Sequence, residues 1–180
     1  MLKIIMTIPL SEDESPLGRV DGEETEIPLT DVRAVEMACE NVNWQADNEY
    51  FAATFEVWVH GELFYENGTT DAHGTWREMM DAIERPGKHR ICFLDSPIDL
   101  KIVHEKHYTF QYTGIDYVWS DDHYLISSSK KTIVSEPLPK DVVETAIRQG
   151  FQQFAAFMLN NDIPISTAYK KELQQRLTEV

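Results

Sequence analysis

The most regular hydrophobic pattern in the chain lies between residues 49 and 60. Every second side chain there is apolar, which gives one apolar side to an extended backbone: Phe51, Ala53, Phe55, Val57 and Val59. This period of two is typical of a strand with one buried face. His60-Gly61 predicts a two-residue hairpin turn into a second strand over residues 62–65, and Asn67-Gly68 is expected to end that strand.

Several further segments have the pattern of strands. Residues 3–8 predict one strand near the N-terminus, and six more are predicted at residues 89–94, 100–103, 108–113, 115–119, 124–127 and 132–134. Ser120-Asp121-Asp122-His123 is expected to form a turn, and Ser127-Ser128-Ser129 the polar end of a hairpin. No alternation of strands with helices runs through this region, so the strands are expected to pair antiparallel.

Two helices are predicted in the first half of the chain. Thr30 is expected to cap a short helix that ends near residue 40 and packs through Val32, Val35, Met37 and Cys39. Thr75 and Glu78 form a capping-box signature, which predicts the start of another helix. Apolar residues then recur at the spacing of one helical face: Trp76, Met79, Met80 and Ile83.

Two more helices are predicted at the C-terminus. Pro139 suits the first turn of a long helix, whose apolar stripe consists of Val143, Ile147, Phe151, Phe154 and Met158. Ser166 is expected to cap a last helix, in which Tyr169, Leu173 and Leu177 recur every four residues and Glu172 precedes Arg176 by four. The elements together predict an α+β fold in one domain over residues 1–180. In this fold a mainly antiparallel sheet has a central short helix and two C-terminal helices, within about 139–180, packed on one face.

The charge of the chain is concentrated in its first half. The formal net charge is −15, from 16 Lys and Arg against 31 Asp and Glu. Residues 1–84 contain 19 acids and four bases, whereas residues 85–180 contain 12 of each. Seven of the acids lie in a segment of about 11–26 that Pro16, Gly18 and Gly22 keep irregular, so a long acidic loop is expected there. An electronegative surface of this kind attracts basic partners.

Composition restricts the classes of protein that remain. No apolar run approaches the roughly 20 residues that cross a bilayer, no secretory signal is apparent, and Cys39 and Cys92 form no CxxC pair. We therefore expect a cytoplasmic protein, of bacterial type, that binds no membrane. Tyr108, Phe110 and Tyr112 could stack on bases, but nucleic-acid binding also needs a positive groove, and the basic patches here are small. No nucleic-acid partner and no cofactor are expected.

The leading hypothesis is a binding protein whose acidic surface neutralises a basic partner. An inhibitor or immunity protein that acts against a basic toxin nuclease is the concrete version, since such a protein needs a rigid fold and a complementary field but no catalytic motif. The chain has no nucleophile-elbow motif, and an enzyme is not the favoured interpretation. The expected partner-binding residues are Glu12, Asp13, Glu14, Asp21, Glu23, Glu24, Glu26, Glu56, Glu62 and Glu66.

Two alternatives remain open. A small enzyme or a ligand-binding or metal-binding domain would use a pocket in the 60–78 segment, lined by His60, Asp71, His73 and Trp76. His104, His107 and His123 are further histidines that such a site could use, but sequence shows no convergence of three ligands, so no metal site is predicted. A structural or assembly subunit would instead associate with copies of itself through the C-terminal helices, at Phe151, Phe154 and Met158.

Overall fold

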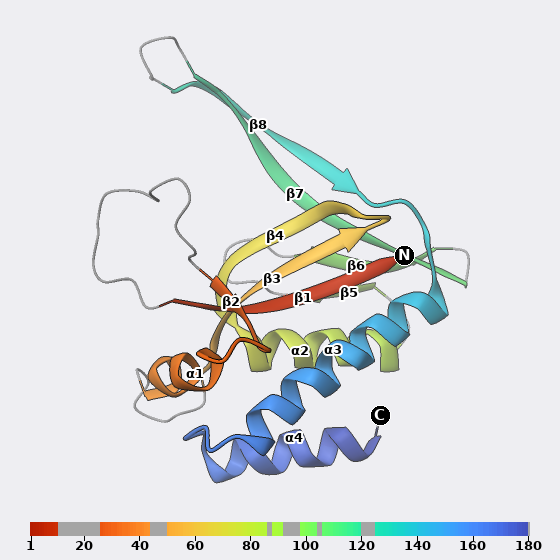
Figure 1. The fold of residues 1–180 in the computed structure, drawn as a ribbon. Helices are drawn as coiled ribbons and strands as arrows, with labels where there is room; N and C mark the ends of the chain where they lie inside the picture. The colour runs from red at the N-terminus through yellow and green to blue at the C-terminus, as the bar shows by residue number, and fades with distance from the viewer. Residues whose placement is uncertain are drawn as a thin grey trace.

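Two antiparallel sheets lie over a layer of helices (Figure 1). The computed structural model describes residues 1–10, 26–43, 50–85, 88–91, 98–103, 106–119 and 125–179. The first sheet has the strand order β2-β1-β3-β4 and is formed by β1 (Leu2–Pro9), β2 (Glu26–Pro28), β3 (Ala52–Val59) and β4 (Glu62–Asp71). All of its pairings are antiparallel.

The second sheet comes from the strand-rich later part of the chain. Its order is β5-β6-β7-β8, with β5 (Lys88–Ile91), β6 (Ile98–Val103), β7 (His107–Trp119) and β8 (Leu125–Val134), and the short β9 (Leu138–Pro139) also pairs with β7. These pairings are antiparallel as well. The far ends of β7 and β8 project from the body of the molecule as a two-stranded ribbon (Figure 1).

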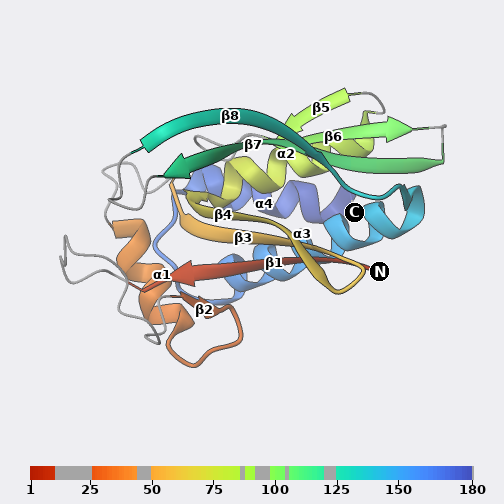
Figure 2. The same ribbon diagram turned by 90° about the horizontal axis from the view of Figure 1, so that it is seen from above.

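Four helices complete the described fold: α1 (Ala34–Asn43), α2 (Ala72–Glu84), α3 (Lys140–Asn160) and α4 (Thr167–Glu179). Seen from above, β1, β3 and β4 lie in front of α2, α3 and α4, and α1 lies at one end beside β1 and β2 (Figure 2). The predicted α+β class, with antiparallel sheets, a short helix in the middle of the chain and two C-terminal helices, is confirmed. None of the described helices is long and apolar enough to cross a membrane.

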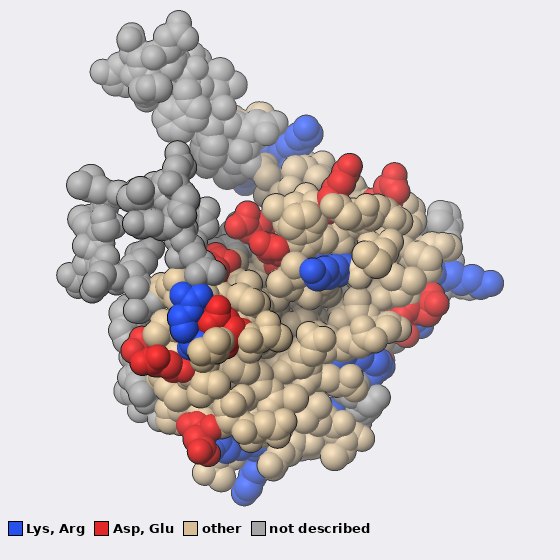
Figure 3. Space-filling model, viewed as in Figure 1, with Lys and Arg blue, Asp and Glu red and all other residues tan. Residues whose placement is uncertain are grey.

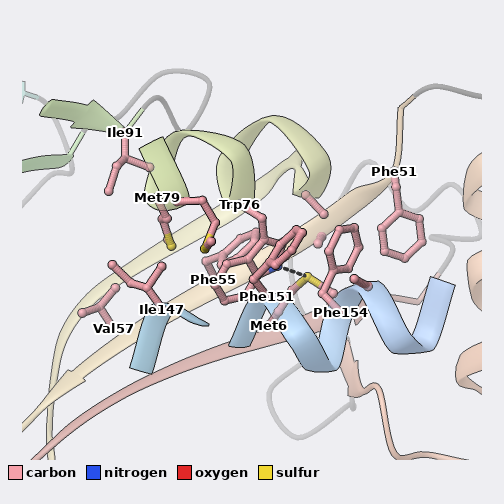
Figure 4. Close-up of a cluster of buried hydrophobic side chains, with 14 of the residues drawn as sticks. Met6, Phe51, Phe55, Val57, Trp76, Met79, Ile91, Ile147, Phe151 and Phe154 are labelled. Atoms are coloured by element: carbon pink, nitrogen blue, oxygen red, sulfur yellow. Dashed lines mark hydrogen bonds between the residues drawn. The ribbon is translucent and has the colours of Figure 1, made fainter. Parts of the chain in front are cut away.

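One apolar core joins the sheets to the helices. The alternating residues of β3 are buried as predicted, as is the predicted face of α2 around Trp76. The Trp76 ring packs edge-on against Phe55 at 5.4 Å between centroids and approaches Phe151 and Met6 (Figure 4). All five residues of the predicted α3 stripe are buried here as well: Val143, Ile147, Phe151, Phe154 and Met158.

The hairpin between β3 and β4 forms where the sequence predicts it, but β4 is longer than expected. His60 and Gly61 have φ angles of 55° and 90°, the left-handed pair that a type I′ turn requires. The strand continues through Asn67-Gly68 to Asp71. Its register with β3 shifts between Ala53 and Phe55, as at a β-bulge, so pairing resumes beyond Asn67-Gly68. Asn67-Gly68 therefore lies within β4 and does not end the strand.

Both helices of the first half begin at other residues than predicted. Asp71 caps α2, where its carboxylate accepts hydrogen bonds from the amides of His73 and Gly74, so the Thr75 capping box does not form. The Thr75 side chain is buried, with its hydroxyl 3.5 Å from that of Thr70. The short helix α1 begins at Ala34, four residues after Thr30, and it buries Ala34, Ala38 and Val42, whereas Val32 and Val35 are exposed.

In the second sheet, pairs of predicted strands merge. Residues 108–113 and 115–119 belong to the single strand β7, and Ser127-Ser128-Ser129 lies inside β8, paired with Val118, Tyr117 and Asp116. The predicted hairpin end at the serines is therefore wrong. Continuous pairing between two long strands compensates for the low strand propensity of Gly114 and of the serines. The predicted turn at 120–123 lies outside the described residues.

Candidate functional site

The outer face of the first sheet carries the described part of the predicted acidic surface. Phe55, Val57 and Val59 point into the core, so Glu56 and Trp58, which alternate with them, project to the other side of the sheet. Figure 2 shows the molecule from the side of these strands. We call the group Ile5, Glu56, Trp58, Leu63 and Glu66 the outer β3–β4 face.

Two carboxylates lie directly opposite each other on this face. Glu56 of β3 pairs in register with Glu66 of β4. Like charges in this position destabilise a sheet. The Glu56 carboxylate accepts a hydrogen bond from the Trp58 indole nitrogen at 2.6 Å, which fixes its position. Among the described residues, neither glutamate forms an ion pair, so the negative charge of the pair is not neutralised within this part of the chain.

Apolar groups surround this pair of acids. Trp58 pairs in register with Leu63, whose side chain is 45% exposed, and Ile5 pairs with Glu56 on the other side. Trp58 and Ile5 are half-buried, so part of each remains available to a partner. Lys3 is the nearest base in register, opposite Trp58. The face therefore combines an uncompensated acidic pair with an aromatic and aliphatic surface.

Of the other predicted acidic residues, Glu26 and Glu62 fall within the described part of the chain. Glu26 lies in β2 and accepts a hydrogen bond from the Thr7 hydroxyl at 2.7 Å, and Glu62 is exposed where β4 begins. Acidic and basic side chains are interspersed over the visible described surface (Figure 3). The remaining six predicted partner-binding residues lie outside the described residues: Glu12, Asp13, Glu14, Asp21, Glu23 and Glu24.

A second polar cluster lies where α4 contacts α2. The imidazole of His73 stacks on the ring of Tyr169, with centroids 4.1 Å apart. Its Nε2 lies 3.3 Å from Glu172 Oε2. One turn further along α4, Arg176 lies 3.3 Å from Asp81 of α2 and 3.6 Å from Glu172. We call these five residues the α2–α4 contact.

Burial dominates the electrostatics of this contact. It lowers the pKa of His73, although the nearby carboxylates of Glu172 and Asp71 act in the opposite direction. It also raises the pKa of Tyr169 well above its ordinary value, and the same two carboxylates add to that increase. His73 Nε2 and the Tyr169 hydroxyl are buried without a hydrogen bond of good geometry among the described residues. His73 is therefore held neutral beside an acidic neighbour.

The four residues of the predicted pocket do not gather at one place. Asp71 and His73 lie together at the start of α2, whereas Trp76 points into the core and donates from its indole nitrogen to Met6 Sδ at 3.3 Å. His60 lies at the opposite end of β4, exposed, with Nδ1 3.2 Å from the N-terminal amine and Nε2 3.7 Å from Glu136. Within the described ranges, no three His, Cys, Asp or Glu side chains converge as a metal site requires.

The sequence did not identify Tyr169 and Glu172 as neighbours of His73. Tyr169 has the spacing of an apolar stripe, and Glu172 and Arg176 that of a helical ion pair, which the 3.6 Å separation bears out. The contact of Tyr169 and Glu172 with His73 depends on tertiary packing, which brings α4 against an α2 that lies almost 100 residues earlier in the chain. His104 and His123 lie outside the described residues.

Comparison of the chain with protein-family models, with curated proteins and with solved structures finds no match.

Proposed function

We propose that this chain is a cytoplasmic protein-binding domain that neutralises a basic partner, with the outer β3–β4 face as the centre of contact. The observation that supports it is the facing pair Glu56 and Glu66, bordered by Trp58 and Leu63. An inhibitor of a basic toxin nuclease, as an immunity protein is, remains the concrete version.

The acidic pair favours a cationic partner for an energetic reason. Two like charges held in register weaken the free protein, and a lysine or arginine placed between them would turn this repulsion into attraction. The Trp58 hydrogen bond keeps the Glu56 carboxylate in position, which reduces the entropy lost on binding. A guanidinium could also stack on the half-buried Trp58 ring.

The apolar neighbours supply what charge alone does not. Protein interfaces derive most of their binding energy from a few buried anchors, among which tryptophan is over-represented. Trp58 and the 45% exposed Leu63 would be covered by a partner and would exclude water from the acidic pair. The excess of acids over bases in residues 1–84 would add long-range attraction and speed association.

The alternative of self-association has less support from the described contacts. Phe151, Phe154 and Met158 are buried inside the chain, so they are not available to a second copy. Contact between copies through the C-terminal helices would have to use α4 or the solvent-facing side of α3.

The proposal is tested with two variants of equal charge. Glu56→Gln with Glu66→Gln removes the facing pair, and Glu36→Gln with Glu40→Gln removes two exposed acids from α1 as a matched control. Each protein serves as bait at low and at high ionic strength, and retained proteins are quantified by mass spectrometry. Binding of the isolated partner is then measured directly.

We expect a basic protein to be retained by the wild type and by the α1 control at low salt. Its affinity for the E56Q/E66Q variant should fall by about tenfold or more, because carboxylates within a contact contribute more than distant ones. If no basic protein distinguishes the two variants, the outer β3–β4 face is not the binding site and the proposal fails.

A further inference from the structure

We propose that the α2–α4 contact is a pH-sensitive clasp, which holds α4 tightly when His73 is neutral and loosens when His73 is protonated. This device is independent of the outer β3–β4 face. It is built from side chains on two helices that are distant in sequence, and it places a single imidazole at their junction.

The geometry gives His73 a central position. The residues of α2 that face α4 include His73 and Asp81, which are two turns apart, and each meets a charged residue of α4. Only 13% of the His73 side chain is exposed, and its ring stacks on Tyr169, which is 3% exposed. A charge on this ring would thus arise between two helices, out of contact with most of the solvent.

The groups that face His73 come from every element around it. Asp71 at the end of β4 and Glu172 on α4 favour the imidazolium, and Arg77 on α2 disfavours it. The Glu172 carboxylate is already engaged by Arg176, with Nε and Oε1 3.6 Å apart. Tyr169 contributes a neutral hydroxyl, because burial and the two carboxylates raise its pKa further above the ordinary value of 10.

The sign of the effect follows from the balance of these terms. Burial is the largest of them, so the pKa of His73 in the folded protein lies below the ordinary value of 6.5. A group whose pKa is lowered by docking takes up its proton more readily when the contact is open. The contact is therefore at full strength above pH 6.5, and it weakens as the pH falls below 6.5 towards the lower folded pKa.

The consequence is local because the rest of α4 packs on apolar residues. Leu173 is fully buried and Leu177 packs against the core, which keeps the helix attached. Histidine is the side chain whose ordinary pKa falls in the mildly acidic range, so this contact would respond there. Protonation is then expected to raise the frequency with which α4 opens, without unfolding α3.

Hydrogen exchange of the full-length protein between pH 7 and pH 5 tests the clasp. After correction for the intrinsic exchange rate, the opening constant of α4 in the wild type should rise by up to about tenfold per pH unit below 6.5, and that of α3 should not. His73→Phe keeps an aromatic ring for stacking but does not titrate, so its α4 should show no such rise. His60→Gln removes an exposed imidazole from the distant hairpin and should behave like the wild type.

A second measurement does not depend on any variant folding. The nuclear magnetic resonance titration of the His73 ring in the wild type should give a pKa below 6.5, with shifts in the amides of Tyr169 and Glu172 that follow the same curve. A His73 pKa at or above 6.5, unchanged α4 protection in the wild type, or the same pH dependence in H73F would each overturn the proposal.

Discussion

At the scale of single residues, the chain buries the Tyr169 hydroxyl group without a hydrogen-bonding partner among the described residues. Tyr169 lies in the α2–α4 contact, stacked on His73. Tyr108 of β7 is buried too, but burial and the nearby Glu144 of α3 raise the pKa of its hydroxyl. A buried hydroxyl without a partner costs roughly 1–3 kcal/mol in desolvation. The Tyr169 ring stacks on His73, so its hydroxyl group is tolerated for the sake of the aromatic surface that comes with it.

Tyr169→Phe tests this interpretation. Since the substitution removes an unpartnered hydroxyl and keeps the ring stacked on His73, the free energy of unfolding should stay unchanged or rise by about 1 kcal/mol. Urea denaturation followed by tryptophan fluorescence measures it, and Tyr108→Phe, which removes a hydroxyl beside Glu144, serves as the comparison. A clear loss of stability in Y169F would show that the hydroxyl has a partner, such as a bound water.

At the scale of elements, the close approach of α2 and α3 determines how the core closes. The indole of Trp76 lies over Gly150 of α3, and a Cβ added there would be 3.0 Å from Cζ3 and closer still to Cη2. The absence of a side chain at Gly150 therefore lets the largest core side chain lie flat against the opposite helix. This contact brings the first turn of α2, with Asp71 and His73, into its place above α4.

Gly150→Ala is accordingly expected to destabilise the protein. An alanine gains up to about 1 kcal/mol in helix propensity, but its Cβ would collide with the buried, rigid indole of Trp76, so overpacking should produce a net loss of roughly 1–3 kcal/mol. Urea unfolding provides the measurement. Gly114→Ala is the comparison, because its nearest neighbour, Ile133 Cδ1, is at an ordinary 3.4 Å. Greater stability in G150A would mean that α3 can move away from α2.

At the scale of the whole molecule, the two sheets share one core. Phe64 and Tyr65 of β4 pack edge-on against Tyr112 of β7, with centroids 5.4 Å and 5.0 Å apart, which connects the sheets directly. Buried residues from both sheets and from all four helices belong to one continuous apolar cluster. Separate unfolding of either sheet would expose the apolar surface of the other.

We therefore expect one cooperative unfolding transition. Far-ultraviolet circular dichroism follows the helices and strands, and near-ultraviolet circular dichroism follows the packing of Trp76 and the tyrosines. The two signals should give the same urea midpoint, as the shared core requires. Two midpoints would indicate that the second sheet, with its projecting β7–β8 ribbon, is a separate unit.

Local patterns in the sequence were sufficient for several elements. The alternation in β3, the left-handed turn at His60-Gly61, the α3 stripe and the Ser166 cap of α4 are all found as predicted, with the Ser166 hydroxyl accepting from the Tyr169 amide at 3.1 Å. Each depends on interactions among residues close in sequence, which a single segment can reveal. The acidic excess of the first half is likewise a property of the sequence alone.

Tertiary structure decided the rest, because the deciding contacts join distant segments. Pairing with β3 carried β4 past Asn67-Gly68 to Asp71, and this made Asp71 the cap of α2 in place of Thr75. Packing of α3 and α4 then placed Tyr169 and Glu172 against His73. The sequence determined which residues are charged, which are aromatic and which can cap a helix. Only the folded chain decided that Glu56 faces Glu66 and that His73 contacts α4. Proximity across a sheet or between helices depends on register and packing.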